Sequence, residues 1–216
     1  MRSDPSFSVL VLCTGNSARS QIAEALIVTR GATRSAGRVV AASAGSRPAS
    51  RVNPFAVEVL AAHGIVWEGR APQSIDDVAG RAFDLVITVC DNAQEACPFF
   101  AGARAQVHWG LPDPAEHTEA EAARAAFAAT YSALSTRVDA LLTLPLEAMD
   151  AAALRVAAQA VHGKVEGDVA RVRRGHDKTF ADLREALFPE GPPARSSLKE
   201  LKRGIADAVR RRHLRD

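Results

Sequence analysis

Four short apolar runs alternate along the chain with longer stretches in which apolar residues recur every three or four positions. The runs cover residues 7–12, 38–44, 83–89 and 105–109. Runs of this length are typical of parallel strands that are buried on both faces, whereas the longer spacing is typical of amphipathic helices. The alternation predicts an α/β fold, with a doubly wound, mostly parallel four-stranded sheet and flanking helices.

The segments between the runs carry signals for helix ends. Asn53 and Pro54 are typical of an N-cap and a first helical position, and Gly64 is typical of a helix end. Thr118 and Glu121 predict a capping box at the start of a long Ala-rich helix. The inward-facing stripe of that helix is expected to comprise Phe127, Tyr131, Leu134, Val138 and Leu141.

The C-terminal part of the chain differs in charge from the rest. One helix is expected over residues 144–160, followed by charged helices over 165–188 and 197–212. We therefore divide the chain into a domain at residues 1–160 and a basic helical C-terminal extension at 161–216, whose role is unknown. The extension holds 14 Lys and Arg against 9 Asp and Glu. Phe180 and Phe188 are its only aromatic residues, so a nucleic acid is not expected as a partner.

Composition places the chain among ordinary globular proteins. It has 216 residues, of which 47% are hydrophobic and 24% charged. No apolar run approaches the roughly 18 residues of a membrane span. The first residues do not resemble a signal peptide, and three cysteines are too few for a secreted disulfide framework. We therefore expect a cytoplasmic protein that does not associate with a membrane.

The segment after the first apolar run predicts an anion-binding loop. The run ends at Cys13, and a Gly-Asn-Ser turn leads through Arg19 into a helix. Backbone N–H groups and the helix N-terminus can surround a tetrahedral oxyanion there. Gly15 and Asn16 are residue types that tolerate a positive φ. The candidate oxyanion-binding residues are Thr14, Gly15, Asn16, Ser17, Ala18, Arg19 and Ser20.

Cys13 is the candidate nucleophile of this loop. Arg19 can hold two oxygens of an anion, and its charge adds to the field of the helix N-terminus. This field is expected to lower the pKa of Cys13 from the ordinary value of about 8.5. The alternative interpretation is a buried strand end with an inert cysteine.

Two further candidate residues follow the later runs. Cys90 comes after the third run, and Asp113 lies in a Pro-Asp-Pro turn after the fourth. Because ligands bind beyond the carboxyl ends of the strands in such sheets, we expect Cys13, Cys90 and Asp113 at one rim. Asp113 can act as a general acid that protonates a leaving oxygen, or it can simply form the turn.

Cys90 and Cys97 form a widely spaced cysteine pair. In a continuous helix seven steps span about 10 Å, whereas the Cα atoms of a disulfide lie within about 7 Å. A bridge therefore requires the segment to loop out. The residues alone leave two interpretations open: a redox segment, or two unrelated buried thiols. A zinc site with His108 has unsuitable spacing, and no metal is predicted.

Together these motifs resemble those of thioredoxin-coupled arsenate reductases, which belong to the low-molecular-weight tyrosine phosphatase superfamily. The resemblance covers about residues 7–160. Its motifs are the segment Cys13–Gln21, Ser43-Ala44-Gly45, Asn53-Pro54, Cys90-x6-Cys97-Pro98, His108-Trp109-Gly110 and Asp113-Pro114-Ala115.

The resemblance implies reduction of arsenate to arsenite, and hence arsenic detoxification. Cys13 would attack arsenate, Arg19 would hold its oxygens, and Asp113 would protonate the leaving hydroxyl. Cys90 would then attack Cys13, and Cys97 would attack Cys90. Thioredoxin, an external reductant, would reduce the redox-active Cys90–Cys97 disulfide, with no bound cofactor. Phosphate and sulfate are expected to compete with arsenate.

Departures from the family pattern sharpen these expectations. Ala115 stands where phosphatase relatives carry a tyrosine, which argues against aryl phosphates. Asn16, Glu24 and Ser43 match positions that bind potassium in some relatives, but an acidic partner is replaced near Gln73, so no cation is expected. The alternative enzyme is a low-molecular-weight phosphatase acting on phosphate monoesters, which does not need the cysteine pair. A third hypothesis is an interaction protein that senses oxyanions or redox state.

Overall fold

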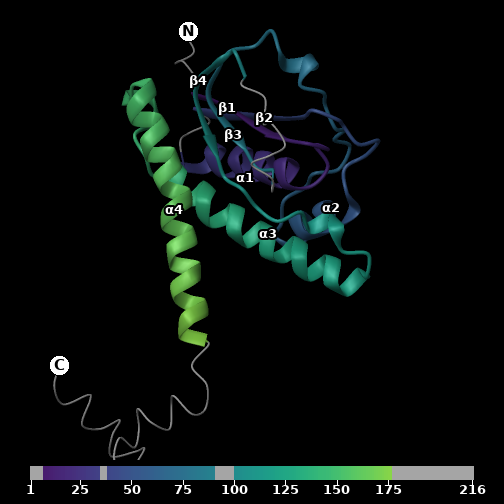
Figure 1. Cartoon of the computed structure of the whole chain (residues 1–216). Helices are drawn as coiled ribbons and strands as arrows, with labels where there is room; N and C mark the ends of the chain where they lie inside the picture. The colour runs from purple at the N-terminus through teal and green to yellow at the C-terminus, as the bar shows by residue number, and fades with distance from the viewer. Residues whose placement is uncertain (1–6, 35–37, 91–99, 177–216) are drawn as a thin grey trace, which may run out of the picture. The chain divides into compact units, whose positions relative to one another are not determined.

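The computed structural model describes residues 7–34, 38–90 and 100–176. Within these residues, four strands form a single sheet in the order β2-β1-β3-β4, and every neighbouring pair is parallel (Figure 1). The strands are β1 Phe7–Cys13, β2 Val39–Gly45, β3 Phe83–Thr88 and β4 Ala103–His108. The predicted parallel α/β sheet is confirmed, and each strand bound lies within two residues of the expected one.

In the described ranges, four α-helices and three short 3-10 helices connect and cover the strands. The α-helices are α1 Arg19–Arg34, α2 Pro54–Ala62, α3 Ala120–Leu141 and α4 Ala151–His176. The 3-10 helices are η1 Asp76–Val78, η2 Pro114–Glu116 and η3 Leu146–Ala148. Asn53 caps α2 as predicted, because its side chain accepts a hydrogen bond from the Phe55 N–H at 3.0 Å.

Two predictions about helix ends are wrong. Helix α3 has Glu119 at its N-cap with no side-chain cap bond, and the Ala123 N–H donates to the Glu119 carbonyl at 2.8 Å. Thr118 therefore lies one residue before the cap, where its hydroxyl cannot act as the N-cap acceptor of a capping box. The helix expected over 144–160 begins only at Ala151 and continues into the one expected from 165, so the two form one helix, α4. No proline occurs between residues 151 and 176, so no proline ends the helix near residue 160.

Both faces of β1 are buried, in two separate clusters. Successive strand residues point to opposite faces. Val9, Val11 and Cys13 join the larger cluster, which also contains residues of all four α-helices. Leu10 and Leu12 join a smaller cluster that includes a residue of η1. The apolar run of β1 is therefore explained by burial on each side.

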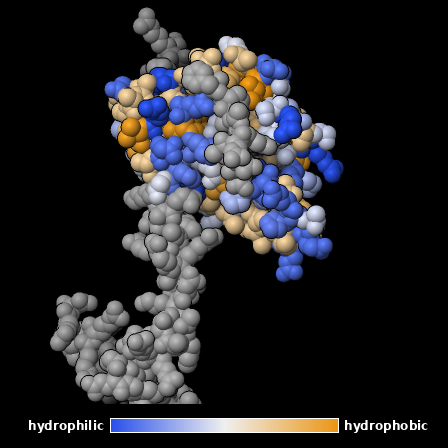
Figure 2. All heavy atoms as spheres, viewed as in Figure 1, coloured by the Kyte–Doolittle hydropathy of each residue, from blue (hydrophilic) through white to orange (hydrophobic). Residues whose placement is uncertain are grey.

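The predicted stripe of α3 is confirmed. Its members Phe127, Tyr131, Leu134, Val138 and Leu141 are all buried. Figure 2 shows hydrophilic residues over much of the viewed face of the described residues, with smaller apolar areas between them.

The chain divides into two compact units, residues 1–168 and 169–216. Helix α4 contributes Leu154, Ala158 and Val161 to the larger cluster. The segments predicted over 197–212 and the end of the one over 165–188 lie outside the described residues. In the part of the chain that the structure describes, no helix is long and apolar enough to cross a membrane.

Candidate active site

The loop between β1 and α1 is held from outside by a neighbouring segment. Backbone N–H groups of residues 46–53 donate to the outward-facing carbonyls of the loop. The pairs are Ser46 to Cys13, Arg47 to Thr14, Ala49 to Gly15 and Asn53 to Ser17, at 2.8–3.2 Å. Because the N–H and C=O of a trans peptide point in opposite directions, the N–H groups of these peptides face away from residues 46–53, into the loop. This arrangement provides the inward donors that an oxyanion requires.

Two backbone features shape the curl of the loop. Asn16 has a φ of +47°, in the left-handed region. Of the two residue types expected to tolerate a positive φ, Asn16 adopts one and Gly15 does not, since among the glycines with described backbone only Gly64 and Gly69 have a positive φ. Gly45 is instead the glycine that the loop requires. A Cβ on Gly45 would lie 2.6 Å from the Thr14 carbonyl oxygen and 2.9 Å from the Asn16 nitrogen.

The Asn16 side chain is fully buried and makes four hydrogen bonds. Its Nδ2 donates to Ser20 Oγ at 2.9 Å and to Ser43 Oγ at 2.7 Å. Its Oδ1 accepts from Gln21 Nε2 at 3.1 Å and from the Gln73 N–H at 2.8 Å. Four bonds use the full capacity of a side-chain amide, so Asn16 is held in one orientation.

Cys13 receives two donors from the loop. Its Sγ lies 3.1 Å from the Asn16 N–H and 2.9 Å from Ser20 Oγ. Either atom of the Cys13–Ser20 contact can be the donor, and once Cys13 is a thiolate only the Ser20 hydroxyl can donate. Cys13 is 6% exposed.

Burial raises the pKa of the Cys13 thiol above its ordinary value. Hydrogen bonds from Ser20 and Asn16, and then the Arg19 charge, oppose that rise. The predicted lowering of the Cys13 pKa is therefore wrong. Loss of water around a sulfur that ends a buried strand outweighs the helix and arginine fields on which the expectation depended.

Arg19 and Asp113 are in direct contact. Arg19 Nη2 lies 2.6 Å from Asp113 Oδ2, and Nη1 donates to the Leu111 carbonyl at 2.7 Å. The other oxygen of Asp113 accepts from the Ala115 N–H at 3.0 Å and so caps η2. The structure thus brings the expected anion clamp and the expected acid to one place. Two of the five N–H donors of the guanidinium are used in these bonds.

Cys90 lies at the same edge of the sheet as Cys13. The residue before it, Val89, donates its N–H to the Leu12 carbonyl at 2.9 Å, so the ends of β3 and β1 are neighbours. Cys90 is 7% exposed and belongs to the same buried cluster as Cys13. Cys13 and Cys90 therefore lie at one rim, and Asp113 meets the same loop through its contact with Arg19. Cys97 lies outside the described residues.

The remaining candidate loop residues have smaller visible roles. Thr14, Gly15 and Ser17 are half-buried, and each offers its carbonyl to the outer segment. Ala18 is buried, and its carbonyl accepts from the Ile22 N–H at 3.0 Å at the start of α1.

Residues beyond the motifs support the loop from behind. Glu24 accepts from Ser43 Oγ at 2.6 Å and lies 3.5 Å from Arg70 Nη1. Burial raises the pKa of Glu24, while Ser43 and the Arg70 charge oppose the rise. Trp67 Nε1 donates to Gln21 Oε1 at 2.7 Å. Sequence reasoning missed Arg70 and Trp67, because no local pattern connects residues 67–70 with a loop some fifty positions earlier.

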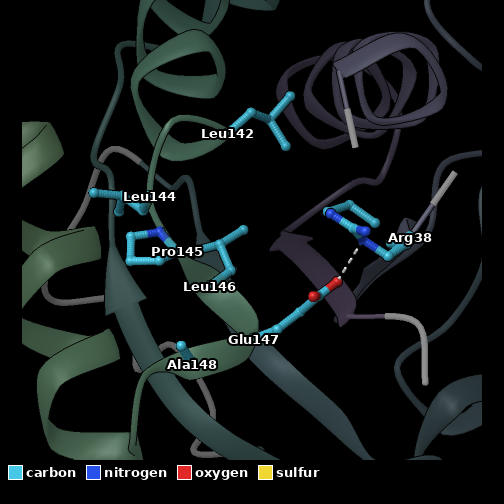
Figure 3. Close-up of a pocket in the computed structure, with 8 residues that line it drawn as sticks. Arg38, Leu142, Leu144, Pro145, Leu146, Glu147 and Ala148 are labelled. Atoms are coloured by element: carbon cyan, nitrogen blue, oxygen red, sulfur yellow. Dashed lines mark ion pairs between the residues drawn. The ribbon is translucent and has the colours of Figure 1, made fainter. Parts of the chain in front are cut away.

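The described residues contain no metal centre. In the ranges 7–34, 38–90 and 100–176, no group of three or more His, Cys, Asp and Glu side chains can hold a metal ion. A hollow lined by Leu142, Leu144, Leu146 and neighbours contains the Arg38–Glu147 ion pair of 3.1 Å (Figure 3). It includes Val39, which begins β2, whereas Gly45, which ends β2, borders the loop. The hollow therefore lies near the N-terminal end of β2, whereas the loop lies near its C-terminal end.

Comparisons with known proteins show which proteins this chain is similar to. A family model described as "Low molecular weight phosphotyrosine protein phosphatase" matches residues 8–155. An arsenate reductase of Halalkalibacterium halodurans is 37% identical over 108 residues, which cover 50% of this chain and 74% of that protein. Arsenate reductase 2 of Staphylococcus epidermidis is 33% identical over 108 residues, covering 50% and 79%.

Solved structures show the same likeness. One described as "An arsenate reductase in the phosphate binding state" has a TM-score of 0.53 and 27% identity, covering 63% of this chain and 97% of that one. An arsenate reductase from Archaeoglobus fulgidus has a TM-score of 0.50 and 27% identity, covering 63% and 99%.

Proposed function

Because the chain belongs to the low molecular weight phosphotyrosine protein phosphatase family, we propose that it is an arsenate reductase that uses the Cys13 loop to bind arsenate. The observation that carries the proposal is the pair of adjacent strand ends at Cys13 and Cys90, joined by the Val89–Leu12 hydrogen bond of 2.9 Å. Hydrolysis needs one thiol, whereas reduction needs a second sulfur within reach. The relatives named as arsenate reductases support the same activity.

The first step is attack on arsenic by the Cys13 thiolate. The S–As bond forms as one As–O bond breaks, and Asp113 supplies the proton with which the oxygen leaves as water. Inward N–H groups of the loop and Arg19 hold the remaining oxygens. To act as the acid, Asp113 must carry a proton when arsenate is bound; in this structure it is paired with Arg19 at 2.6 Å.

The second step reduces arsenic. The Cys90 thiolate attacks Cys13 Sγ, a Cys13–Cys90 disulfide forms, and the electron pair of the broken S–As bond stays on arsenic as arsenite. Two thiols are thereby oxidised to one disulfide, and arsenate gains two electrons. The closeness of the two strand ends supports this step.

The last step exports the oxidation. Cys97 attacks Cys90, which frees Cys13 and leaves a Cys90–Cys97 disulfide. We propose that thioredoxin, with no bound cofactor, reduces this bridge in the cytoplasm, and that phosphate and sulfate compete for the loop. Three sulfurs are required, and the chain has three cysteines.

The experiment that tests this proposal is arsenate-dependent oxidation of reduced thioredoxin by the full chain, followed by mapping of the trapped disulfide. We expect turnover, a Cys90–Cys97 bridge, and no turnover with Cys90→Ser. Undiminished turnover by Cys90→Ser would exclude the relay.

A phosphatase acting on phosphate monoesters is the second candidate, because Cys13, Arg19 and Asp113 meet without the cysteine pair. Hydrolysis of a small phosphate monoester by Cys90→Ser at the unaltered rate, with no arsenate turnover by the native chain, would favour it.

We also propose that residues 1–160 carry the activity and that the extension lies outside catalysis. The cut that tests this comes after Asp168, because Val161 is buried in the core and Arg137 Nε donates to His162 Nδ1 at 3.2 Å. Full arsenate turnover by residues 1–168 is expected. Loss of turnover by a folded truncated chain would place part of the activity in the extension.

A further inference from the structure

Six side chains form a closed ring of contacts behind the oxyanion loop. One route leads from Asn16 through Ser43 and Glu24 to Arg70, with contacts of 2.7, 2.6 and 3.5 Å. The other leads from Asn16 through Gln21 and Trp67, with hydrogen bonds of 3.1 and 2.7 Å. It ends on the same Arg70, whose guanidinium carbon lies 4.3 Å from the Trp67 ring centroid. Arg70 therefore closes the ring.

Arg70 differs from the other members of the ring in its exposure. Its side chain is 47% exposed, whereas the Glu24 side chain is 5% exposed and Trp67 is buried. A half-exposed side chain can be replaced without leaving a cavity in the core. The ring thus has one member that can be altered while the packing around the loop is retained.

The charge of Arg70 matters because Glu24 is buried. A buried carboxylate is costly unless a positive group and hydrogen bonds compensate it. With Glu24 ionised, the bonds run in one direction, from Asn16 Nδ2 to Ser43 Oγ and from Ser43 Oγ to Glu24 Oε2. A protonated Glu24 can instead donate to Ser43 Oγ. The Ser43 hydroxyl then no longer has to donate to Glu24, and the direction of the bonds is no longer fixed.

Asn16 transmits this arrangement to the reacting sulfur. Its backbone N–H donates to Cys13 Sγ, and its side chain orients Ser20, whose hydroxyl lies 2.9 Å from the same sulfur. A shift of the Asn16 amide therefore alters both donors at Cys13, and the inward N–H groups of the loop with them.

We propose that Arg70 is a positioning residue of the oxyanion loop, acting on Asn16 through Glu24 and through the Trp67 ring. This role of Arg70 deepens the proposed function and rests on it for the identity of the bound anion. Arg70 holds the loop in the form that binds a tetrahedral oxyanion and presents Cys13. Removal of its guanidinium weakens both properties.

The test compares Arg70→Met with two reference variants of the full chain. Arg70→Lys keeps the positive charge. Arg104→Met removes the same charge at the other end of the sheet, where Arg104 pairs with Asp84 at 3.0 Å and lies over Phe7 at 5.7 Å. Inorganic phosphate is the probe, and binding is measured by calorimetry. The rate of Cys13 alkylation by iodoacetamide, read by peptide mass spectrometry, is the second measurement.

We expect Arg70→Met to weaken phosphate binding about tenfold, a size typical of coupling within one hydrogen-bond and ion-pair network. The Cys13 alkylation rate should change with it, while Arg70→Lys and Arg104→Met stay within about twofold of the native chain. Trp67→Phe, which removes the Nε1 donor to Gln21, should change both measurements in the same direction. If Arg70→Met does not fold, Arg70→Gln, which removes the charge but keeps a polar side chain at this half-exposed position, takes its place with the same expected results.

Native values for Arg70→Met in both measurements would overturn the proposal, as would an equal loss in Arg104→Met. If the native chain does not bind phosphate, the proposed function fails. The Arg70 inference is then still decided by the alkylation rate, which needs no anion.

Discussion

Arg19 and Asp113, which are 94 positions apart, form an ion pair of 2.6 Å at the rim of the sheet. Arg19 begins α1 and Asp113 precedes η2, so two connections that follow different strands meet there. The pair keeps the expected acid beside the loop and holds the guanidinium by a carboxylate and the Leu111 carbonyl at once. An oxyanion that enters the loop must share Arg19 with Asp113.

Asp113→Asn should lower turnover while leaving anion binding largely intact. Asparagine retains an oxygen that accepts from Arg19, but it has no proton to give to the leaving oxygen. We expect turnover of arsenate to fall about 10²- to 10⁴-fold, the range for loss of a general acid. Phosphate binding, measured by calorimetry, should change less than tenfold. Turnover within a factor of two of the native chain would remove Asp113 from the chemistry.

Ser20→Ala should raise the pKa of Cys13 further. Burial already raises this pKa, and the Ser20 hydrogen bond is the first of the contacts that oppose the rise. The midpoint of the rate of Cys13 alkylation by iodoacetamide against pH should therefore move upward, and the rate at neutral pH should fall. Ser132→Ala, at an exposed position of α3, is the control and should keep the native midpoint. A midpoint that moves downward would contradict the prediction.

Gly45→Ala should distort the loop from behind. The added Cβ would lie 2.6 Å from the Thr14 carbonyl and 2.9 Å from the Asn16 nitrogen, so the backbone must move. We expect a loss of about 1–3 kcal/mol in the free energy of unfolding, as in overpacked cores, together with weakened phosphate binding.

Gly80→Ala is the matched control for this substitution. A Cβ at Gly80 meets nothing within 4 Å. Stability within about 0.5 kcal/mol of the native chain is expected there. A Gly45→Ala protein that binds phosphate normally would show that the close approach of β2 does not shape the loop.

Glu24→Gln should alter how stability depends on pH. Burial raises the pKa of Glu24 above its ordinary value of 4.5, so the folded chain binds the proton more tightly than the unfolded chain does. Its stabilising effect is therefore present below pH 4.5 and is lost as pH rises through the higher folded pKa. Glutamine cannot titrate, so this component should disappear from denaturant unfolding followed at several pH values. An unchanged pH profile would contradict the burial of the Glu24 charge.

The predicted parts of the fold and site are those encoded in short stretches of chain. Four apolar runs and the α3 stripe follow from periodicity, because burial on one or both faces imposes a spacing of residues. The turn from Cys13 to Arg19 was identifiable because a strand, a flexible turn and a helix start occur within a few positions. The common rim followed from topology, since carboxyl ends of parallel strands share one edge.

What only the tertiary structure decided depends on residues that are distant in the chain. The direction of the Cys13 pKa shift reflects burial, and burial is produced by elements from the whole domain packing around the strand end. The Arg19–Asp113 pair and the ring through Arg70 join segments whose separation in sequence carries no information about contact. Helix α3 begins at Ala120, with Glu119 rather than Thr118 as its N-cap. The residues around Thr118 do not by themselves distinguish between these two starting positions. Sequence by itself thus determined the helices, the strands and the reactive loop. Long-range packing determined the ion pairs around that loop and the direction of the Cys13 pKa shift.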